Sequence, residues 1–332
     1  QTSRLTATNL VYSYLDGGKW VKIIADSQLG VGEWTSLDLD SSDRPHISYY
    51  DKPNGDLKYT YYNGVTWTTS IVDSAGTVGL GTSLKLDSTN KPHIAYHDEL
   101  GGNLKYAKYN GATWDITTID TYGDVGEWPS MVLDSNDRPH ISYLQAFTVG
   151  AVTYWVLGYA HHDGAKWNNE TADDFHGVGI FSGIDVDSND RPHISYRDGT
   201  PDGYLRYTYH DGAQWNRGRV DSEGDCGMYT SIALDSSDTP MITHRDGTGQ
   251  NLKFAFLKDD AWHSEIVDGM GDVGRYSSLV IDDNDNAFVS YTVGWKDEVR
   301  FAMRDITFPV IDSDTSDAFG TTGDDFHFNI SA

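Results

Sequence analysis

The stretch "SNDRPHISY" occupies Ser135–Tyr143 and returns letter for letter at Ser188–Tyr196. Weaker copies of the same phrase occur along most of the chain, about 47 residues apart, and a period of this length indicates a repeat architecture. Five full units begin at Gly32, Gly79, Gly126, Gly179 and Gly227, and a shorter sixth unit begins at Gly274. The repeat is therefore the first feature that any fold must explain.

Each unit holds four short runs that read as strands, separated by clusters of Gly, Asp, Asn and Pro. Turns such as "DSSDRP" and "DSNDRP" join the first run to the second, because Asp and Asn bond their own backbone and Pro begins a strand. Four strands per unit without helical periodicity predict an all-β fold, a six-bladed β-propeller of four-stranded antiparallel blades. A tryptophan marks the fourth strand of each blade: Trp20, Trp67, Trp114, Trp167, Trp215 and Trp262.

The two ends of the repeat region are incomplete. Residues 1–31 carry only a third and a fourth strand, and the sixth unit lacks a Trp-marked fourth strand. We therefore expect the N-terminal segment to close the ring by completing the last blade. One third strand is then surplus, either "LVYSY" at Leu10–Tyr14 or "VRFAM" at Val299–Met303, and the sequence leaves both open.

The pattern "D(S/N)xDRPHISYYD…LKYxYYNGxxW" resembles the tandem propeller repeats of large secreted and surface proteins of bacteria and archaea. The resemblance covers residues 2–306 and implies a propeller domain over 1–306 and an extracellular, cell-surface location. The tail, "FPVIDSDTSDAFGTTGDDFHFNISA", resembles the first strands of an immunoglobulin-like or cadherin-like module. Residues 307–332 are accordingly expected to be the truncated start of such a domain.

Charge and hydropathy narrow the range of partners. The 50 acidic residues against 24 Lys and Arg give a formal charge of −26, so nucleic acid and anionic membranes would be repelled. No run approaches the roughly 18 apolar residues of a membrane span. We expect a monomeric propeller that binds a glycan or another surface protein.

Two repeated polar features have structural interpretations. The fifth and sixth units place Met241 and Phe288 where the others carry histidine, so that position favours packing over metal binding; the histidines are His46, His93, His140 and His193. The acidic hairpins offer few oxygens and lack the close ligand ladder of calcium loops, so turn chemistry is favoured over calcium. No cofactor or metal is expected, with calcium as the alternative.

Function is expected where the repeats differ. Aligning "VGEWTS" with its counterparts places aromatic residues at one position of five units and Gly81 in the remaining one; the aromatics are Trp34, Trp128, Phe181, Tyr229 and Tyr276. Loops from the second to the third strand should reach the same face of a propeller. They add Asp51, His97, Asp98, Arg197 and Arg245 to the candidate ligand-binding residues.

Exposed rings among Arg and Asp suit sugars, whose C–H faces stack while their hydroxyls hydrogen-bond. The alternative is that these aromatics only plug the channel mouth. Binding is favoured over catalysis because no GxSxG or HExxH motif is present. A polysaccharide lyase or glycosidase with its site on the same face remains the alternative, and its catalytic residues are unknown.

Overall fold

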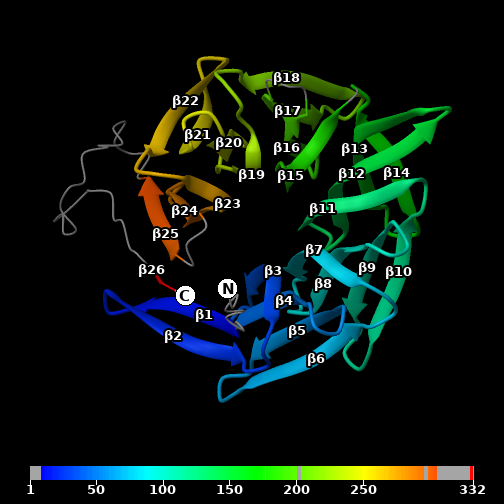
Figure 1. Ribbon diagram of the computed structural model, residues 1–332, viewed down its shortest axis with the longest axis vertical. Coiled ribbons are helices and arrows are strands. Elements are labelled where there is room, and N and C mark those ends of the chain that lie inside the picture. The colour runs from blue at the N-terminus through cyan, green and yellow to red at the C-terminus, as the bar shows by residue number, and fades with distance from the viewer. Residues whose placement is uncertain (1–8, 176, 200–202, 295–297, 305–329, 332) are drawn as a thin grey trace, which may run out of the picture. The chain divides into compact units, whose positions relative to one another are not determined.

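The structure, a computed structural model, describes residues 9–175, 177–199, 203–294, 298–304 and 330–331. Its regular elements are β-strands, and no helix occurs in these ranges. No helix long and apolar enough to span a membrane is found among the same residues. The strands form six four-stranded antiparallel sheets, the blades of a β-propeller, and one separate two-stranded sheet (Figure 1).

Each blade takes its strands in chain order, from the first to the fourth. The first blade contains β3 (Val31–Leu39), β4 (Pro45–Asp51), β5 (Asp56–Tyr62) and β6 (Trp67–Asp73). The second contains β7 (Val78–Leu86), β8 (Pro92–Asp98), β9 (Asn103–Tyr109) and β10 (Trp114–Asp120). The third contains β11 (Asp124–Leu133), β12 (Pro139–Val149), β13 (Val152–His162) and β14 (Trp167–Asp173).

The remaining blades follow the same plan. The fourth contains β15 (Val178–Val186), β16 (Pro192–Asp198), β17 (Leu205–His210) and β18 (Trp215–Asp221). The fifth contains β19 (Met228–Leu234), β20 (Pro240–Asp246), β21 (Asn251–Lys258) and β22 (Ala261–Asp268). The sixth contains β23 (Val273–Ile281), β24 (Ala287–Val293), β25 (Glu298–Arg304) and β26 (Ile330–Ser331).

The chain divides into two compact units, each described here by itself. The first comprises residues 1–153 and 160–169, and the second comprises residues 154–159 and 170–332. In both units the second strands carry the core: every residue of β4 and β20 is buried, whereas fourth strands such as β6 are mostly exposed. The apolar runs of the repeated phrase therefore become the buried second strands.

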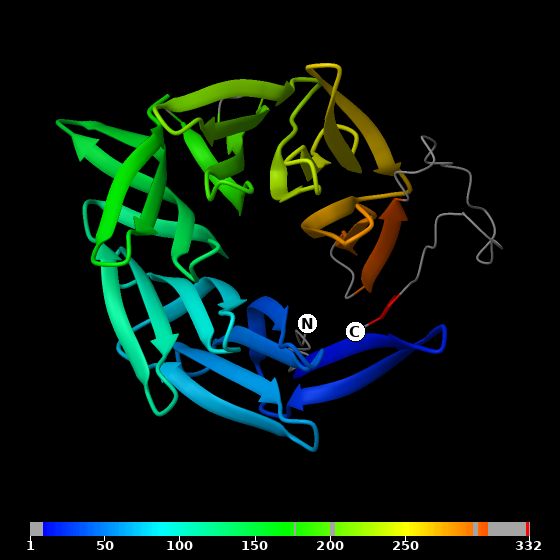
Figure 2. The same cartoon turned by 180° about the vertical axis from the view of Figure 1, so that it is seen from behind.

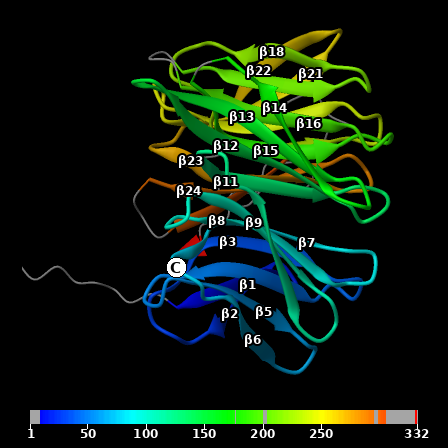
Figure 3. The ribbon, with the colours of Figure 1, turned by 90° about the vertical axis from the view of Figure 1, so that its right-hand side faces the viewer.

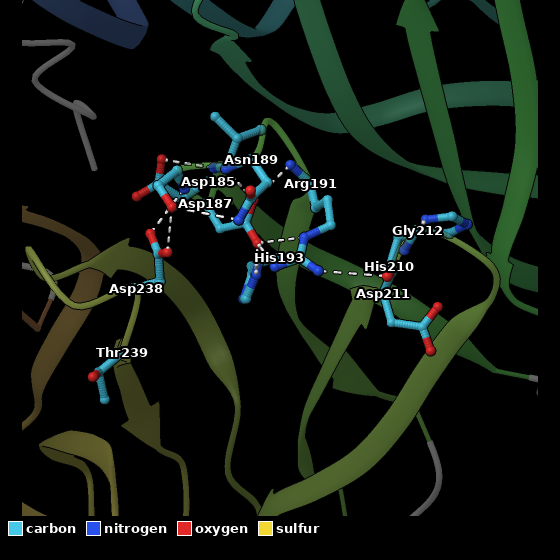
Figure 4. A network of polar contacts seen from close by, with 12 residues as sticks. Asp185, Asp187, Asn189, Arg191, His193, His210, Asp211, Gly212, Asp238 and Thr239 are labelled. Carbon is cyan, nitrogen blue, oxygen red and sulfur yellow. Dashed lines mark hydrogen bonds and ion pairs between the residues drawn. The ribbon is translucent and has the colours of Figure 1, made fainter.

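The hairpin turn of the repeated phrase links neighbouring blades (Figure 4). Asp187 caps its own turn, accepting from the Arg191 backbone N–H at 2.8 Å and from Arg191 Nε at 2.6 Å. Ser188 donates from its backbone N–H and Oγ to Asp238 of the next hairpin, at 2.8 and 2.6 Å. Asp238 receives both bonds in the left-handed conformation, with φ 62°. The recurring Asp and Ser therefore serve structure, as the sequence indicated.

The repeated histidines are packed inside the blades. All four are buried, at His46, His93, His140 and His193. His93 Nδ1 lies 2.7 Å from the Tyr106 hydroxyl, and its Nε2 lies 3.4 Å from Asp87. Burial lowers the pKa of His93 to about 4, which keeps the ring neutral near pH 7. The interpretation as packing residues is confirmed.

A second set of buried polar links joins the end of each fourth strand to the following blade. The carboxylates of Asp26, Asp73, Asp120, Asp173 and Asp268 accept from the hydroxyls of Tyr49, Tyr96, Tyr143, Tyr196 and Tyr291, respectively. In the fifth blade His244 takes the tyrosine's place, with Nε2 3.5 Å from Asp221. These buried pairs fix how one blade packs on the next.

The N-terminal hairpin differs from expectation. β1 (Leu10–Asp16) and β2 (Lys19–Asp26) form a sheet of their own, and β26 supplies the fourth strand of the sixth blade. The hairpin packs on the first blade, where Leu10 and Asp26 contact the β4 core, and β2 lies beside β5 and β6 (Figure 3).

This arrangement corrects the prediction that the N-terminal segment completes the last blade. β25, which contains "VRFAM", fills the third position of the sixth sheet, so "LVYSY" in β1 is the surplus third strand. Because Asp26 makes the same bond to Tyr49 that the other fourth strands make to their neighbours, the hairpin is specified by the blade that follows it. The expected immunoglobulin-like start at 307–332 lies outside the described residues, apart from Ile330 and Ser331.

Candidate functional site

The aromatic position of each first strand has an unusual backbone. The strand pairing is interrupted there by a β-bulge, as between Glu33 and Ser36 in the first blade. All five aromatic residues have a left-handed φ between 48° and 55°, namely Trp34, Trp128, Phe181, Tyr229 and Tyr276, and Gly81 has φ 59°. A bulky residue in this region is rare and costs about 1–2 kcal/mol. Such strain is characteristic of functional sites.

In the second unit these aromatics pack ring against ring at tilted angles in a continuous arc, here called the second arc (Phe181, Tyr229 and Tyr276). Ring centroids lie 4.5 Å apart for Phe181 and Tyr229, and 4.7 Å apart for Tyr229 and Tyr276. The carbonyls of Phe181 and Tyr229 accept from Thr230 Oγ1 and Ser277 Oγ at 2.7 and 2.8 Å. The three strands that carry the arc, β15, β19 and β23, are neighbours (Figure 2).

In the first unit the corresponding set is interrupted, and it is here called the first arc (Trp34, Gly81 and Trp128). Trp34 is 37% exposed, and no ring contact to its indole occurs among the residues that the structure describes. A Cβ on Gly81 would lie 2.9 Å from Pro129 Cδ, closer than real side chains approach. Position 81 requires glycine because the next blade carries Pro129 directly after its aromatic residue, Trp128. The missing ring at position 81 therefore has a steric cause.

The predicted aspartates are used by their own loops. Asp51 is buried and accepts from Gln28 Nε2 at 2.8 Å and Asn54 Nδ2 at 2.9 Å. Asp98 accepts from the Gly101 N–H at 2.9 Å. The bonds to Asn54 and Gly101 hold the connections between second and third strands, and the bond to Gln28 ties Asp51 to the loop between β2 and β3.

The predicted basic residues reach acidic residues that precede the next blade. Arg197 Nη2 lies 2.6 Å from Asp225, and Arg245 Nη2 lies 2.6 Å from Asp272. His97 Nε2 lies 3.6 Å from Asp124, and burial lowers the pKa of His97. We call these pairs the inter-blade clamps.

The aligned sequence contains a signal for the clamps. In three units the second strand ends in a basic residue followed by Asp, and an aspartate then precedes the next unit. In the first unit the basic residue is replaced by Tyr50, and Thr77 replaces the aspartate. In the third unit Leu144 and Gly177 occupy these two positions. Comparing these two columns of the repeat would have revealed the pairs. Position-by-position reading of each loop did not.

The candidate residues thus fall into two sets, one in each unit. The first unit holds Trp34 and Trp128 with Asp51, His97 and Asp98, and the second holds the second arc with Arg197 and Arg245. Among the described residues no group of three or more His, Cys, Asp or Glu side chains could hold a metal ion. The first set offers ring faces and carboxylates, and the second offers ring faces and Arg–Asp pairs, groups that suit polyhydroxylated ligands.

Comparisons with known proteins identify the fold. No known family and no curated sequence matches the chain. A lectin of Aleuria aurantia, solved as a mutant with Fucalpha1-6GlcNAc, has a TM-score of 0.54 at 12% identity, covering 82% of this chain and 91% of the lectin. The chain shares its β-propeller fold. That lectin is described as a six-bladed β-propeller with fucose recognition.

Two further solved structures show the same likeness. A mutant of AofleA from Arthrobotrys oligospora has a TM-score of 0.56 at 11% identity, covering 91% of this chain and 87% of its own. An α-L-arabinofuranosidase from Fusarium graminearum, with an iminosugar inhibitor, has a TM-score of 0.54 at 12% identity, covering 80% and 88%. At these identities the likeness establishes the fold alone.

Proposed function

We propose that this propeller binds a glycan against the aromatic residues of its first-strand bulges. The observation that carries the proposal is the repeated left-handed aromatic, of which Trp34 keeps an exposed ring that contacts no other ring among the described residues. A protein that only needed to fill space would not hold bulky residues in a strained conformation at five positions. A sugar ring can stack on the indole while neighbouring polar groups bond its hydroxyls.

The solved structures support this ligand class. The Aleuria aurantia lectin was solved with a fucosylated disaccharide, and the Fusarium graminearum enzyme with an iminosugar inhibitor. We extend the proposal to an extracellular setting, in which the propeller recognises a glycan on a surface or on another surface protein. The net charge of −26 disfavours binding to nucleic acid, which supports a glycan as the ligand.

A glycan-array screen of the full chain tests the proposal. We expect at least one glycan to bind, and Trp34→Ala to weaken that binding by about 1–3 kcal/mol, as for other aromatic anchors. Tyr209→Ala is the matched control, because Tyr209 is also 37% exposed but lies on a third strand. Binding that survives Trp34→Ala, or a screen without any bound glycan, would refute the proposal.

The enzyme alternative has one observation in its favour. Burial, and then the charges of Asp124 and Glu99, raise the pKa of Glu127, which precedes Trp128 in the first arc. A raised carboxyl pKa suits a general acid acting on a glycosidic bond. If the bound polymer is cleaved and Glu127→Gln abolishes cleavage while binding persists, the site is catalytic.

A further inference from the structure

The first unit contains three carboxylates without a cation to neutralise them, here called the acidic cluster (Glu99, Asp124 and Glu127). Among the described residues none of the three forms an ion pair with Lys or Arg, and Asp124 alone has a charged-type contact, 3.6 Å from His97 Nε2. Burial lowers the pKa of His97, so the ring is neutral near pH 7 and adds no positive charge. Burial, and then the charges of Asp124 and Glu99, raise the pKa of Glu127, so the three groups act on one another. The cluster is therefore strongly negative.

Two buried polar side chains lie beside the acidic cluster without a hydrogen bond of their own. Tyr50 is only 8% exposed, and its hydroxyl has no hydrogen-bond partner among the described residues. After burial, the charges of Glu99 and Glu33 contribute most to raising the pKa of Tyr50, so its hydroxyl lies near both carboxylates. His97 is 5% exposed, and its Nε2 likewise has no hydrogen-bond partner in that part of the chain. Buried polar atoms are seldom left unpaired, so these two are placed to bond a ligand.

The exposed ring of Trp34 belongs to the same three blades. Glu33 precedes Trp34 and pairs with Tyr50 across β3 and β4. The Glu99 backbone N–H donates to the Thr77 carbonyl at 2.9 Å, which holds the Glu99 loop against the segment before β7. Strand β7 contacts both β3 and β11 (Figure 1). Aromatic ring, buried hydroxyl and acidic cluster thus follow one another along neighbouring blades.

The ligand that suits these groups is a cation with hydrogen-bond donors. Among the described residues no three His, Cys, Asp or Glu side chains are placed to hold a metal ion. An ammonium group has no such geometric demand, because its three N–H donors rotate freely to reach carboxylate, hydroxyl or imidazole acceptors. An aromatic face also attracts it. The net charge of −26 adds a long-range attraction for cationic ligands.

We propose that the first unit binds a chain of amino sugars, with one sugar ring stacked on Trp34 and ammonium groups bonded by the acidic cluster. This inference rests on the proposed glycan-binding function and specifies its ligand class. The Tyr50 hydroxyl and His97 Nε2 bond the ligand from the buried side. Charge-assisted bonds from ammonium to carboxylate are stronger than the neutral bonds that an acetylated amine could form.

Calorimetric titration of the full chain with one matched pair of probes tests the inference. The pair is a chitosan oligosaccharide, in which every sugar carries an amine, and the chitin oligosaccharide of equal length, in which each amine is acetylated. We expect the chitosan oligosaccharide to bind about tenfold or more tightly at a pH where its amines are protonated. Added salt should reduce this preference, because it screens the charges.

Variants separate the subsite from the overall charge. Glu99→Gln combined with Glu127→Gln should lower the affinity for the chitosan oligosaccharide about tenfold or more and leave chitin binding unchanged. Glu170→Gln is the matched control, because it removes one negative charge from an exposed position of β14, outside the cluster. Tyr50→Phe should weaken the chitosan oligosaccharide less than the double variant does. Trp34→Ala should weaken both oligosaccharides.

Equal affinity for the two oligosaccharides, or a double variant that binds chitosan as the parent does, would overturn the inference. So would failure of both probes to bind, or a loss on Glu170→Gln as large as that of the double variant. If neutral glycans bind and Trp34→Ala weakens them, the proposed function stands while the amino-sugar subsite falls. If the broad glycan array also finds nothing, both fall.

Discussion

The first and second arcs occupy the same position of the repeat but present their rings differently. In the second arc Tyr229 lies between two other rings at 4.5 and 4.7 Å, so much of its surface is used within the protein. In the first arc Gly81 interrupts the series, and Trp34 keeps an exposed indole. One glycine therefore leaves the exposed ring of Trp34 without a ring neighbour, whereas the exposed Tyr276 of the second arc packs on Tyr229. The cause lies in the neighbouring blade, at Pro129.

The largest expected effect concerns His244 of the fifth blade, the blade that carries Tyr229 of the second arc. His244 stands where the other blades carry a tyrosine. His244 is fully buried, and burial lowers its pKa to about 4 from an ordinary 6.5. Between these values the unfolded chain binds the extra proton, so stability falls as the pH falls from 6.5 to 4. His244→Tyr should remove up to about 3 kcal/mol of that loss.

Urea unfolding at pH 7 and pH 4.5 measures this difference. If the parent and His244→Tyr lost the same stability between pH 7 and pH 4.5, burial of His244 would not be the cause of the acid sensitivity.

The next effect tests the origin of the gap in the first arc. Gly81→Ala should cost about 2–3 kcal/mol, because its Cβ meets Pro129 Cδ and its φ is left-handed. In a Pro129→Thr background, which introduces the residue type of Thr82 and Thr230, the cost should fall to about 1 kcal/mol. Denaturation midpoints of the four proteins decide. If Gly81→Ala cost the same stability in both backgrounds, the contact with Pro129 would not be the reason for glycine at position 81.

A third experiment compares the arcs directly. Tyr229→Ala should cost about 1–3 kcal/mol of stability, since it removes two aromatic pairs of about 0.5–1.5 kcal/mol each. Trp34→Ala should cost less stability and more glycan affinity. If Trp34→Ala were the more destabilising of the two, the first arc would be a plug and not a binding surface.

The smallest effect concerns backbone strain. Trp34→Gly should be about 1 kcal/mol more stable than Trp34→Ala, because glycine accepts φ 54° without a Cβ penalty. At Trp67 in β6, where φ is not left-handed, the order should reverse, with the glycine variant less stable. The same order at both positions would indicate that the bulge stores no strain.

The blade count and the strand order could be predicted from the sequence because their signals are local. Asp and Pro at each hairpin and Trp at each fourth strand repeat with the period of the fold. The sheet to which the N-terminal hairpin belongs could not be predicted from the sequence. Leu10–Tyr14 and Val299–Met303 both have the pattern of a third strand, and only their pairing in the structure distinguishes them.

The candidate site was located only in part for a related reason. Alignment of the repeats found the aromatic position. It could not show that the backbone at Trp34 is left-handed, because tryptophan rarely adopts that conformation and does not indicate it. The clamps depend on pairs such as Arg245 and Asp272, far apart in the chain, and each partner alone reads as an ordinary surface charge. Pairwise contacts between repeats carry information that no single repeat contains.

The hairpin links between blades have an evolutionary consequence. The hairpin of the fifth blade accepts from one neighbour and donates to the other, because Asp238 accepts from Ser188 and Ser236 donates to Asp285. At one joint Asn90 takes the acidic position, and Ser41 then accepts from its amide, because a rotating hydroxyl can serve either way. A duplicated blade can therefore form the hairpin bond to either neighbour without a change of residue. Pairs such as Gly81 with Pro129 and Arg245 with Asp272 would still have to be matched.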